Sequence, residues 1–239
     1  MNIFMWSGPR NISTALMRSF ENRDDTEVID EPFYAYYLKK TKKSHPMSKT
    51  IINSYDTNLK SIINKISKKQ SNGKILYQKH MTHHILNNVS IEWVSKGINC
   101  FLIRDPKKVI NSYTKENFLF DSSDIGFPNQ MKLFKYIFKI NDCPIVINSD
   151  DLLKNPEKNI KILCKKLNIP FTKKMMKWPK GPRDSDGIWS KIWYKQVNQS
   201  TNFVKYKKKP IQIDNKYNNI YNECKKIFDE LNKYNLFNE

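Results

Sequence analysis

The chain has 239 residues, of which 39% are hydrophobic, and a formal net charge of +19. This length suits one domain with a sizeable core, and only six glycines and 11 prolines exclude a fibrous or low-complexity chain. Four scattered cysteines without a Cys-x-x-Cys pair argue against a disulfide framework or zinc site and predict a cytoplasmic protein. No apolar run approaches the ~18 residues of a membrane span, and we expect no signal peptide.

The positive charge alone does not identify a partner. Lysines occur along the whole chain, together with many asparagines and isoleucines, as expected from an AT-rich coding sequence. Most of the charge is therefore attributed to solvated surface, and a smaller share would steer a polyanionic ligand. We expect no nucleic-acid partner, because the chain has no aromatic strand motif or zinc knuckle.

Short apolar runs alternate with helical patterns along the chain. This alternation predicts an α/β fold with a mainly parallel, doubly wound central sheet of about five strands flanked by helices. The expected strands are 2–7, 26–29, 75–77, 99–103 and 144–147. The expected helices are 13–22, one starting at 32, 51–66, 85–96, 106–117, 129–141, 149–154, 156–167 and 215–236.

Residues 171–210 differ from the rest of the chain, because they are rich in Trp, Lys and Pro and show little periodicity. We interpret them as a long loop region with short helices that covers a cofactor or substrate. No internal repeat or second domain is evident, so one domain over 1–239 is expected.

The stretch SGPRNIST, residues 7–14, lies between the first expected strand and the first expected helix. A helix N-terminus at this place presents backbone N–H groups and a positive dipole end to an anion. Gly8 permits a tight turn, the guanidinium of Arg10 can grip an anion with two hydrogen bonds, and Ser13 and Thr14 add hydroxyl donors. The position and these residue types predict a phosphate-binding loop and a three-layer fold of the P-loop type.

The letters of this loop do not match the nucleotide pattern G-x-x-x-x-G-K-[ST]. Counted from Gly8, Ser13 replaces the second glycine, Thr14 the lysine and Ala15 the hydroxyl that would bind magnesium. Phosphoryl transfer depends on that magnesium, whereas a sulfuryl group carries less charge and can move without a metal. The loop therefore favours a phosphosulfate, and the alternative is an ordinary turn whose Arg10 makes a surface ion pair.

The stretch FLIRDPKKVINSY, residues 101–113, carries a second anion site. Arg104 ends a strand, Asp105 can cap the next helix and Pro106 can occupy its first position. Ser112 lies two helical turns past Asp105 and so faces the same way. Arg104 and Ser112 can hold one phosphate at the carboxyl edge of the sheet, where ligands of such folds bind.

SGPRNISTAL at 7–16 and DEPFYAY at 30–36 together resemble the bacterial sulfotransferase-like family. This family is related to the sulfotransferases that use 3′-phosphoadenosine-5′-phosphosulfate (PAPS), and the stretch 101–113 is similar to their 3′-phosphate motif. The resemblance implies that Arg104 and Ser112 bind the 3′-phosphate. It also implies a 5′-phosphosulfate site formed by Pro9, Arg10, Asn11, Ile12, Ser13 and Thr14.

A third stretch, KGPRDSDGIWSKIWY at 180–194, resembles more loosely the family loop that closes over adenine and the 3′-phosphate. The resemblance implies cofactor contacts from Lys180 and Gly181. Arg183 would add a cation, and Trp189 would pack on the base. The alternative is a surface loop anchored by its tryptophan.

Sulfuryl transfer needs a base for the acceptor proton and a cation near the departing oxygen. Glu31 is the preferred base, because some bacterial sulfotransferases use a glutamate before a proline at this point, and His80 or His83 would assist it. Lys79, with Arg10, would stabilise the sulfate and the leaving phosphate. Bacterial family members more often have an aspartate in place of His80, so the identity of the catalytic histidine stays open.

We therefore expect an enzyme that transfers a sulfuryl group from PAPS to a hydroxyl or amine of a small-molecule acceptor. No metal is expected, because the histidines near residue 80 lack an H-E-x-x-H pattern and a nearby cysteine. A homodimer is compatible with the sequence. The alternatives are a magnesium-dependent P-loop kinase and a basic, non-catalytic protein that binds nucleic acid.

Overall fold

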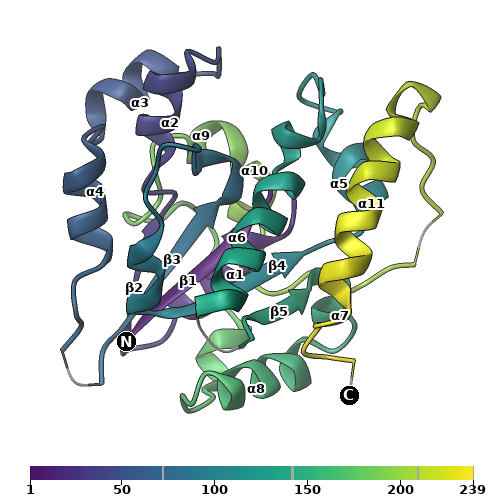
Figure 1. Cartoon of the computed structure of the whole chain (residues 1–239). Helices are drawn as coiled ribbons and strands as arrows, with labels where there is room; N and C mark the ends of the chain where they lie inside the picture. Colours follow the sequence, from purple (N-terminus) through teal and green to yellow (C-terminus); the bar gives the residue numbers. More distant parts are fainter. Residues whose placement is uncertain (72, 141–142, 209, 239) are drawn as a thin grey trace.

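The computed structural model describes residues 1–71, 73–140, 143–208 and 210–238. Its centre is a sheet of five parallel strands in the order β2-β3-β1-β4-β5 (Figure 1). The strands are β1 (Asn2–Ser7), β2 (Thr26–Asp30), β3 (Ile75–Met81), β4 (Ile98–Ile103) and β5 (Ile145–Asn148). The predicted α/β class with a parallel central sheet is confirmed, and each expected strand lies within three or four residues of its observed bounds.

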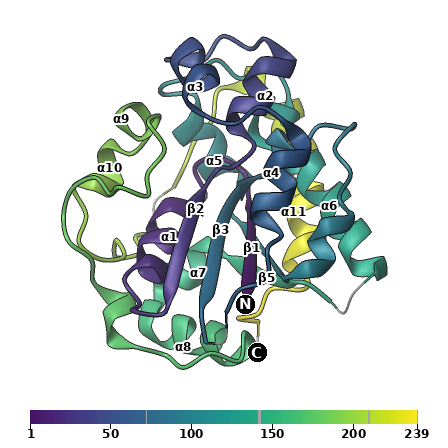
Figure 2. The same cartoon turned by 90° about the vertical axis from the view of Figure 1, so that its left-hand side faces the viewer.

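Helices cover both faces of the sheet, which is why β1, β3 and β5 are buried along their whole length, whereas the edge strand β2 is only partly buried (Figure 2). The helices are α1 (Ser13–Glu21), α2 (Tyr34–Thr41), α3 (Ser48–Ser54), α4 (Leu59–Ile66), α5 (Pro106–Tyr113), α6 (Phe127–Ile140), α7 (Ser149–Lys154), α8 (Pro156–Lys166), α9 (Ser190–Trp193), α10 (Lys195–Asn198) and α11 (Asn218–Asn232). Helices α1, α7 and α8 pack on one face, and α4, α6 and α11 pack on the other.

Two expected helices are corrected by the structure. The expected helix 51–66 is two helices, because the Asp56 side chain accepts from the N–H of Asn58, and the Asn58 side chain caps α4 by accepting from Ser61 N. The expected helix 85–96 is wrong: the 3₁₀ turn η1 (Thr82–His84) precedes it, and the only helical element within it is the 3₁₀ turn η2 (Glu92–Lys96). Asparagine and serine between these turns compete with the helical hydrogen bonds.

The region 171–210 consists largely of irregular chain with short helices, as expected from its composition. It contains the 3₁₀ turn η4 (Lys173–Met176) and the short helices α9 and α10. The remaining 3₁₀ turns are η3 (Ser122–Ile125) and η5 (Asn215–Tyr217). Over the described ranges, no helix is both long and apolar enough to cross a bilayer.

Gly8 fixes the start of the β1–α1 loop by close packing. A Cβ atom at Gly8 would lie 2.4 Å from the carbonyl oxygen of Ile125, which is backbone and cannot swing away. We expect Gly8→Ala to lower the free energy of unfolding by about 1–3 kcal/mol, measured by urea denaturation, because overpacking displaces the loop. Gly73→Ala is the matched control: it meets no atom within 4 Å but has a φ of +76°, so it bears only a backbone cost of about 1–2 kcal/mol. Unchanged stability of Gly8→Ala would contradict the packing argument.

Candidate functional site

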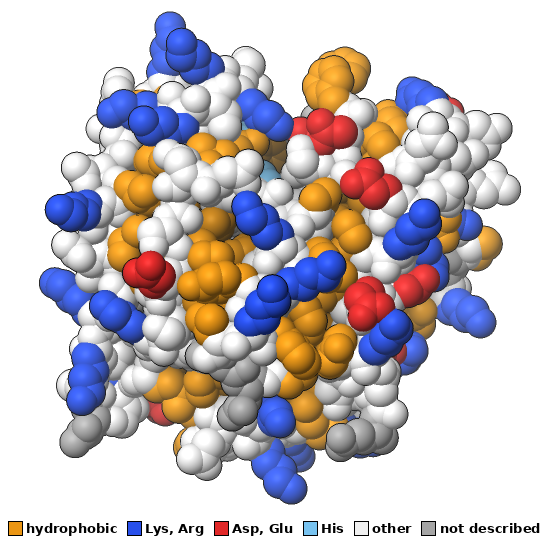
Figure 3. Space-filling view, viewed as in Figure 1, with side chains coloured by type: hydrophobic (Ala, Val, Ile, Leu, Met, Phe, Trp, Pro, Cys, Tyr) orange, Lys and Arg blue, Asp and Glu red, His pale blue; other side chains and the backbone are white. Residues whose placement is uncertain are grey.

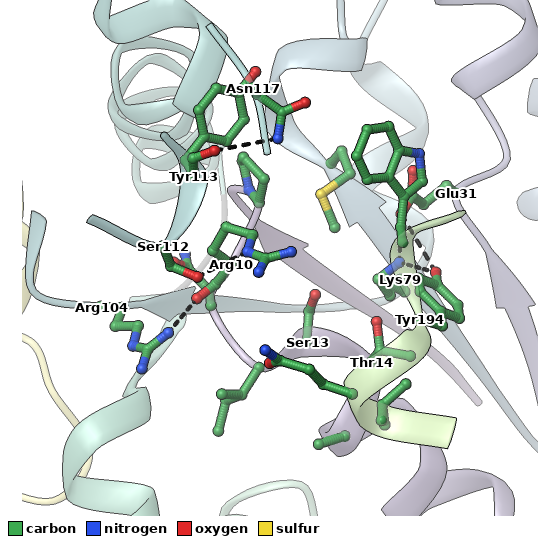
Figure 4. A pocket seen from close by; sticks show the side chains of 18 of the residues that line it. Arg10, Ser13, Thr14, Glu31, Lys79, Arg104, Ser112, Tyr113, Asn117 and Tyr194 are labelled. Carbon is green, nitrogen blue, oxygen red and sulfur yellow. Dashed lines mark hydrogen bonds and ion pairs between the residues drawn. The ribbon is translucent and has the colours of Figure 1, made fainter. Parts of the chain in front are cut away.

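A cavity of about 280 Å³ opens at the carboxyl edge of the sheet, where β1, β3 and β4 end. Most of the residues expected at the site line it: Pro9, Arg10, Asn11, Ile12, Ser13, Thr14, Glu31, Lys79, His83, Arg104 and Ser112. Figure 4 shows Arg10, Arg104 and Ser112 on one side and Glu31, Lys79 and Tyr194 on the other, with Ser13 and Thr14 between them. The structure thus brings both expected anion sites and the expected reacting groups to one cavity.

The first expected anion site is the loop between β1 and α1. Arg10 and Ile12 have φ values of 63° and 60°, a left-handed conformation that non-glycine residues adopt mainly where the surroundings enforce it. Asn11 supplies part of that constraint, because its side chain donates to the carbonyl of Leu102 over 3.1 Å. Among the described residues no side chain caps α1 at Ile12, so the N–H groups of its first turn are left for an anion.

The second expected anion site joins the first through two hydrogen bonds. Nε of Arg10 donates to Oγ of Ser112 over 2.9 Å, and Nη1 of Arg104 donates to the carbonyl of Arg10 over 2.6 Å. Nε of Arg104 is buried, has no hydrogen-bond partner within the described chain, and lies 4.0 Å from the carboxylate of Asp150. Arg10 also forms the expected surface ion pair, with Glu116 at 3.3 Å, and the same side chain lines the cavity.

The environment of Arg104 is suited to an anion. Burial lowers the pKa of its guanidinium, and the positive charge of Arg10 lowers it further, whereas the carboxylate of Asp150 raises it. Nζ of Lys108 lies closer to the Asp150 carboxylate, at 2.8 Å, and so offsets much of the negative charge that Arg104 would otherwise meet. An anionic ligand would complete the hydrogen bonding of Arg104 and offset its desolvation.

The reacting end of the cavity is a buried network of two carboxylates, a lysine and a tyrosine. Nζ of Lys79 donates to Asp30 over 2.8 Å, to Oε1 of Glu31 over 2.5 Å and to the hydroxyl of Tyr194 over 2.6 Å. The Tyr194 hydroxyl lies 2.8 Å from each carboxylate oxygen of Asp30. Oε2 of Glu31 lies 4.0 Å from Nδ1 of His84.

Burial and neighbouring charge set the protonation of this network. Burial alone would lower the pKa of Lys79, but the carboxylates of Asp30 and Glu31 outweigh it and raise that pKa, so the lysine stays charged. Burial raises the pKa of Glu31; Lys79 opposes the rise and Asp30 adds to it. Glu31 is thus a more basic carboxylate than an exposed glutamate.

The structure separates the histidines of the 80–84 stretch. His80 and Lys79 are adjacent on β3, so their side chains point to opposite faces of the sheet. His80 packs in the core against Trp6, with ring centroids 4.6 Å apart, and burial together with the charge of Lys79 lowers its pKa to about 3. His83 and His84 follow the strand and line the cavity, whereas His80 does not.

His83 and His84 are neutral at the cavity wall. Burial lowers the pKa of His83 to about 3 and lowers that of His84 as well. The ring of His84 stacks on Tyr34 at 4.7 Å between centroids. No group of three His, Cys, Asp or Glu side chains in the described ranges is placed to share a metal ion.

The segment 180–189 lies away from the cavity. Lys180, Gly181, Arg183 and Trp189 are not among the residues that line it. Trp189 is 1% exposed and packs against Tyr34 rather than facing a ligand. The next part of the chain lines the cavity instead, with Trp193, Tyr194, Gln196, Val197, Ser200, Asn202, Phe203 and Val204.

Sequence reasoning missed Asp30, His84 and Tyr194 as members of the site. Asp30 ends β2 next to Glu31, and His84 follows His83 shortly after the end of β3, so proximity to these two expected site residues was the available signal. Tyr194 ends the stretch 180–194, but its contact with Lys79 joins residues 115 positions apart. No local pattern indicates such a contact.

Lysine and arginine side chains are scattered over the face shown in Figure 3 and do not gather into one patch. That distribution agrees with solvated surface as the main source of the net charge of +19.

Comparison with known proteins decides the family. The model of a family described as a sulfotransferase domain matches residues 1–218. The chain belongs to this sulfotransferase family. Its fold agrees with solved sulfotransferase domains: one from the Synechococcus PCC 7002 olefin synthase has a TM-score of 0.58 at 14% identity, covering 96% of this chain and 94% of that domain. One from the curacin biosynthetic pathway has a TM-score of 0.55 at 13% identity, covering 96% of both chains.

Two curated relatives come from Arabidopsis thaliana. The sulfotransferase domain is 35% identical over 211 residues to branched-chain-amino-acid aminotransferase-like protein 1, covering 87% of this chain and 37% of the relative. It is 31% identical over 231 residues to protein 2 of the same name, covering 96% of this chain and 41% of the relative. The chain therefore spans about two fifths of the length of these relatives, whose names describe the whole plant proteins.

Proposed function

We propose that the chain transfers a sulfuryl group from PAPS to a hydroxyl or amine of a small-molecule acceptor. The observation that carries the proposal is that two linked anion sites and a basic carboxylate open onto one cavity. The donor would supply the activated sulfuryl group. Among the described residues, the buried Nε of Arg104 has no hydrogen-bond partner and no side chain caps the first turn of α1, and these two features fit the two anionic ends of such a donor.

We assign the donor contacts to the residues that line the cavity. Arg104 and Ser112 would hold the 3′-phosphate, and the loop from Pro9 to Thr14 would hold the 5′-phosphosulfate. Lys180, Gly181, Arg183 and Trp189 lie outside the cavity, so they would support the covering segment rather than touch the donor.

Glu31 is the proposed general base. Its Oε1 is held by Lys79, which leaves Oε2 to take the proton from the acceptor. Arg10 and the N–H groups at the start of α1 would stabilise negative charge as it develops on the departing oxygen. Because cations and N–H dipoles of the chain supply this stabilisation, we propose a transfer that needs no metal.

His83 remains a proposed assistant at the acceptor side, because it lines the cavity. His80 would act only through packing, because it lies in the core on the other face of β3. We place the reaction in the cytoplasm, where the thiols of Cys100, Cys143, Cys164 and Cys224 would stay reduced.

Ligand-induced stabilisation tests the donor class. We expect PAP, the desulfated donor, to raise the melting temperature, because a ligand that binds the native state stabilises it by mass action. At a concentration about 100 times its Kd, PAP should add about 2.7 kcal/mol. ATP with Mg²⁺ and ADP should raise the melting temperature less. A larger shift with ATP and Mg²⁺ would favour a kinase, and a shift only with RNA or DNA would favour a nucleic-acid-binding protein.

A further inference from the structure

The ammonium group of Lys79 has no donor left for a ligand. A lysine has three N–H donors, and three acceptors surround Nζ: Asp30 at 2.8 Å, Glu31 at 2.5 Å and Tyr194 at 2.6 Å. The Lys79 side chain is 1% exposed. Its charge therefore holds the two carboxylates, and Tyr194 completes this arrangement.

The hydroxyl of Tyr194 connects the charged groups to one another. It accepts from Lys79 and donates its single proton toward the carboxylate of Asp30, whose two oxygens both lie 2.8 Å away. The same carboxylate accepts from the N–H of Gly187 over 3.2 Å. Tyr194 and Gly187 thus bring one chain segment, 187–194, onto the ends of β2 and β3.

Other contacts hold that segment in place. Nη2 of Arg18 pairs with Asp186 at 2.6 Å, and both side chains are buried. The indole of Trp189 packs against Tyr34 and Tyr55, with centroids 5.1 and 5.0 Å away. The segment is therefore fastened to α1 and to the wall of the cavity, next to the residues of α10 that line it.

We infer that Tyr194 is a positioning residue for sulfuryl transfer: its hydroxyl fixes Lys79 between Asp30 and Glu31, and so keeps Oε2 of Glu31 free for the acceptor proton. This inference rests on the proposed function. It also gives segment 187–194 a role other than contact with the donor: through the Tyr194 hydroxyl, the segment fixes the position of the Glu31 carboxylate. Figure 4 shows Tyr194, Lys79 and Glu31 pointing toward one another at one end of the cavity.

The test is Tyr194→Phe, which keeps the ring and removes the hydroxyl. The groups that face Glu31 are Lys79, Asp30, Tyr194, His84 and Tyr34. Burial and the charge of Asp30 raise the pKa of Glu31, and the proton that Tyr194 donates to Asp30 offsets part of that charge. Loss of the hydroxyl should raise the pKa of Glu31 further, so its carboxyl should titrate at higher pH.

The titration is followed in the unliganded protein by ¹³C-carboxyl NMR, with the Glu31 signal assigned by its absence in Glu31→Gln. Turnover of PAPS is measured with p-nitrophenol and a panel of alcohols and amines as acceptors. The kcat of Tyr194→Phe should be about 10- to 100-fold below that of the wild type, because Glu31 is misplaced. The acid limb of the pH profile should move to higher pH, because only the ionised base is active. The Kd for PAP should stay within twofold.

Tyr77→Phe is the matched control, because the Tyr77 hydroxyl is buried without a hydrogen-bond partner in the described ranges and lies outside the cavity. It should leave the Glu31 titration and kcat unchanged. A Glu31 midpoint in Tyr194→Phe equal to that of the control overturns the inference. Wild-type protein that neither binds PAP nor turns over PAPS overturns the proposed function instead.

If Tyr194→Phe does not fold, protein with 3-fluorotyrosine at position 194 alone, introduced by stop-codon suppression, replaces it. Fluorine makes the hydroxyl a stronger donor without removing it, so the Glu31 midpoint should move to lower pH. An unchanged midpoint there also overturns the inference.

Discussion

Glu31→Gln is expected to lower kcat about 10²- to 10⁴-fold while PAP affinity stays near that of the wild type. The substitution keeps the shape of the side chain and removes the oxygen that would take the acceptor proton. It also leaves Lys79 with Asp30 and Tyr194 as partners, so the network is not dismantled. Steady-state kinetics of PAPS turnover and calorimetric titration with PAP measure the two effects.

The pH dependence of kcat/KM is a second test of Glu31 as the base. Burial and the charge of Asp30 raise the pKa of Glu31, and only the ionised carboxylate can act as a base. Wild-type kcat/KM should therefore fall as the pH drops through that raised pKa, above the range of an exposed glutamate, and Glu31→Gln should lose this limb. Glu157→Gln, which alters an exposed ion pair with Lys161 on α8, is the control. A variant of Glu31 that keeps full activity and the same pH limb would assign the base elsewhere.

Arg104→Ala is expected to weaken PAP binding about 10- to 150-fold. A hydrogen bond to a charged group is worth about 1.5–3 kcal/mol, and Nε of Arg104, which has no partner in the part of the chain that the structure describes, is a donor for such a bond. Binding of adenosine 5′-phosphosulfate, which lacks the 3′-phosphate, should change much less. The ratio of the two affinities, measured by calorimetry, therefore isolates the 3′-phosphate from general damage to the cavity.

Arg23→Ala serves as the matched control for Arg104→Ala. Arg23 is also a buried arginine, but it pairs with Asp25 at 2.7 Å and lies outside the cavity. Its removal should reduce stability without changing the affinity ratio. Equal weakening of both ligands in Arg104→Ala would mean that this guanidinium supports the loop through the carbonyl of Arg10 and does not read the 3′-phosphate.

The parts of the site with local signals were predictable from the sequence. The loop at 8–12 follows a buried strand and opens a helix, and both elements are observed where they were expected. Asp105 caps α5 by accepting from Lys107 N over 2.8 Å, and Pro106 takes the first helical position, as the FLIRDPKKVINSY stretch predicted. Both anion sites follow from such strand-to-helix junctions.

Contacts that depend on long-range packing were not predictable. Alternation along β3 already implied that Lys79 and His80 point to opposite faces, but only the packed sheet shows which face meets the cavity. The pairing of Tyr194 with Lys79 depends on how segment 187–194 folds back over α1. The split of the expected helix 51–66, by contrast, has a local cause, because Asp56 and Asn58 form a turn and a helix cap there.

The strand order β2-β3-β1-β4-β5 places two groups of cavity residues on opposite sides of β1. The groups proposed to grip the donor follow β1 and β4, whereas Glu31 and Lys79 belong to β2 and β3 on the far side of β1. Changes on the β2 and β3 side of the cavity, which Tyr34 and Tyr37 of α2 also line, would therefore leave the groups proposed to hold the donor in place. A chimera of two relatives could therefore take β2 and β3 from one protein and β1 and β4 from the other, with the boundary between the two parts beside β1.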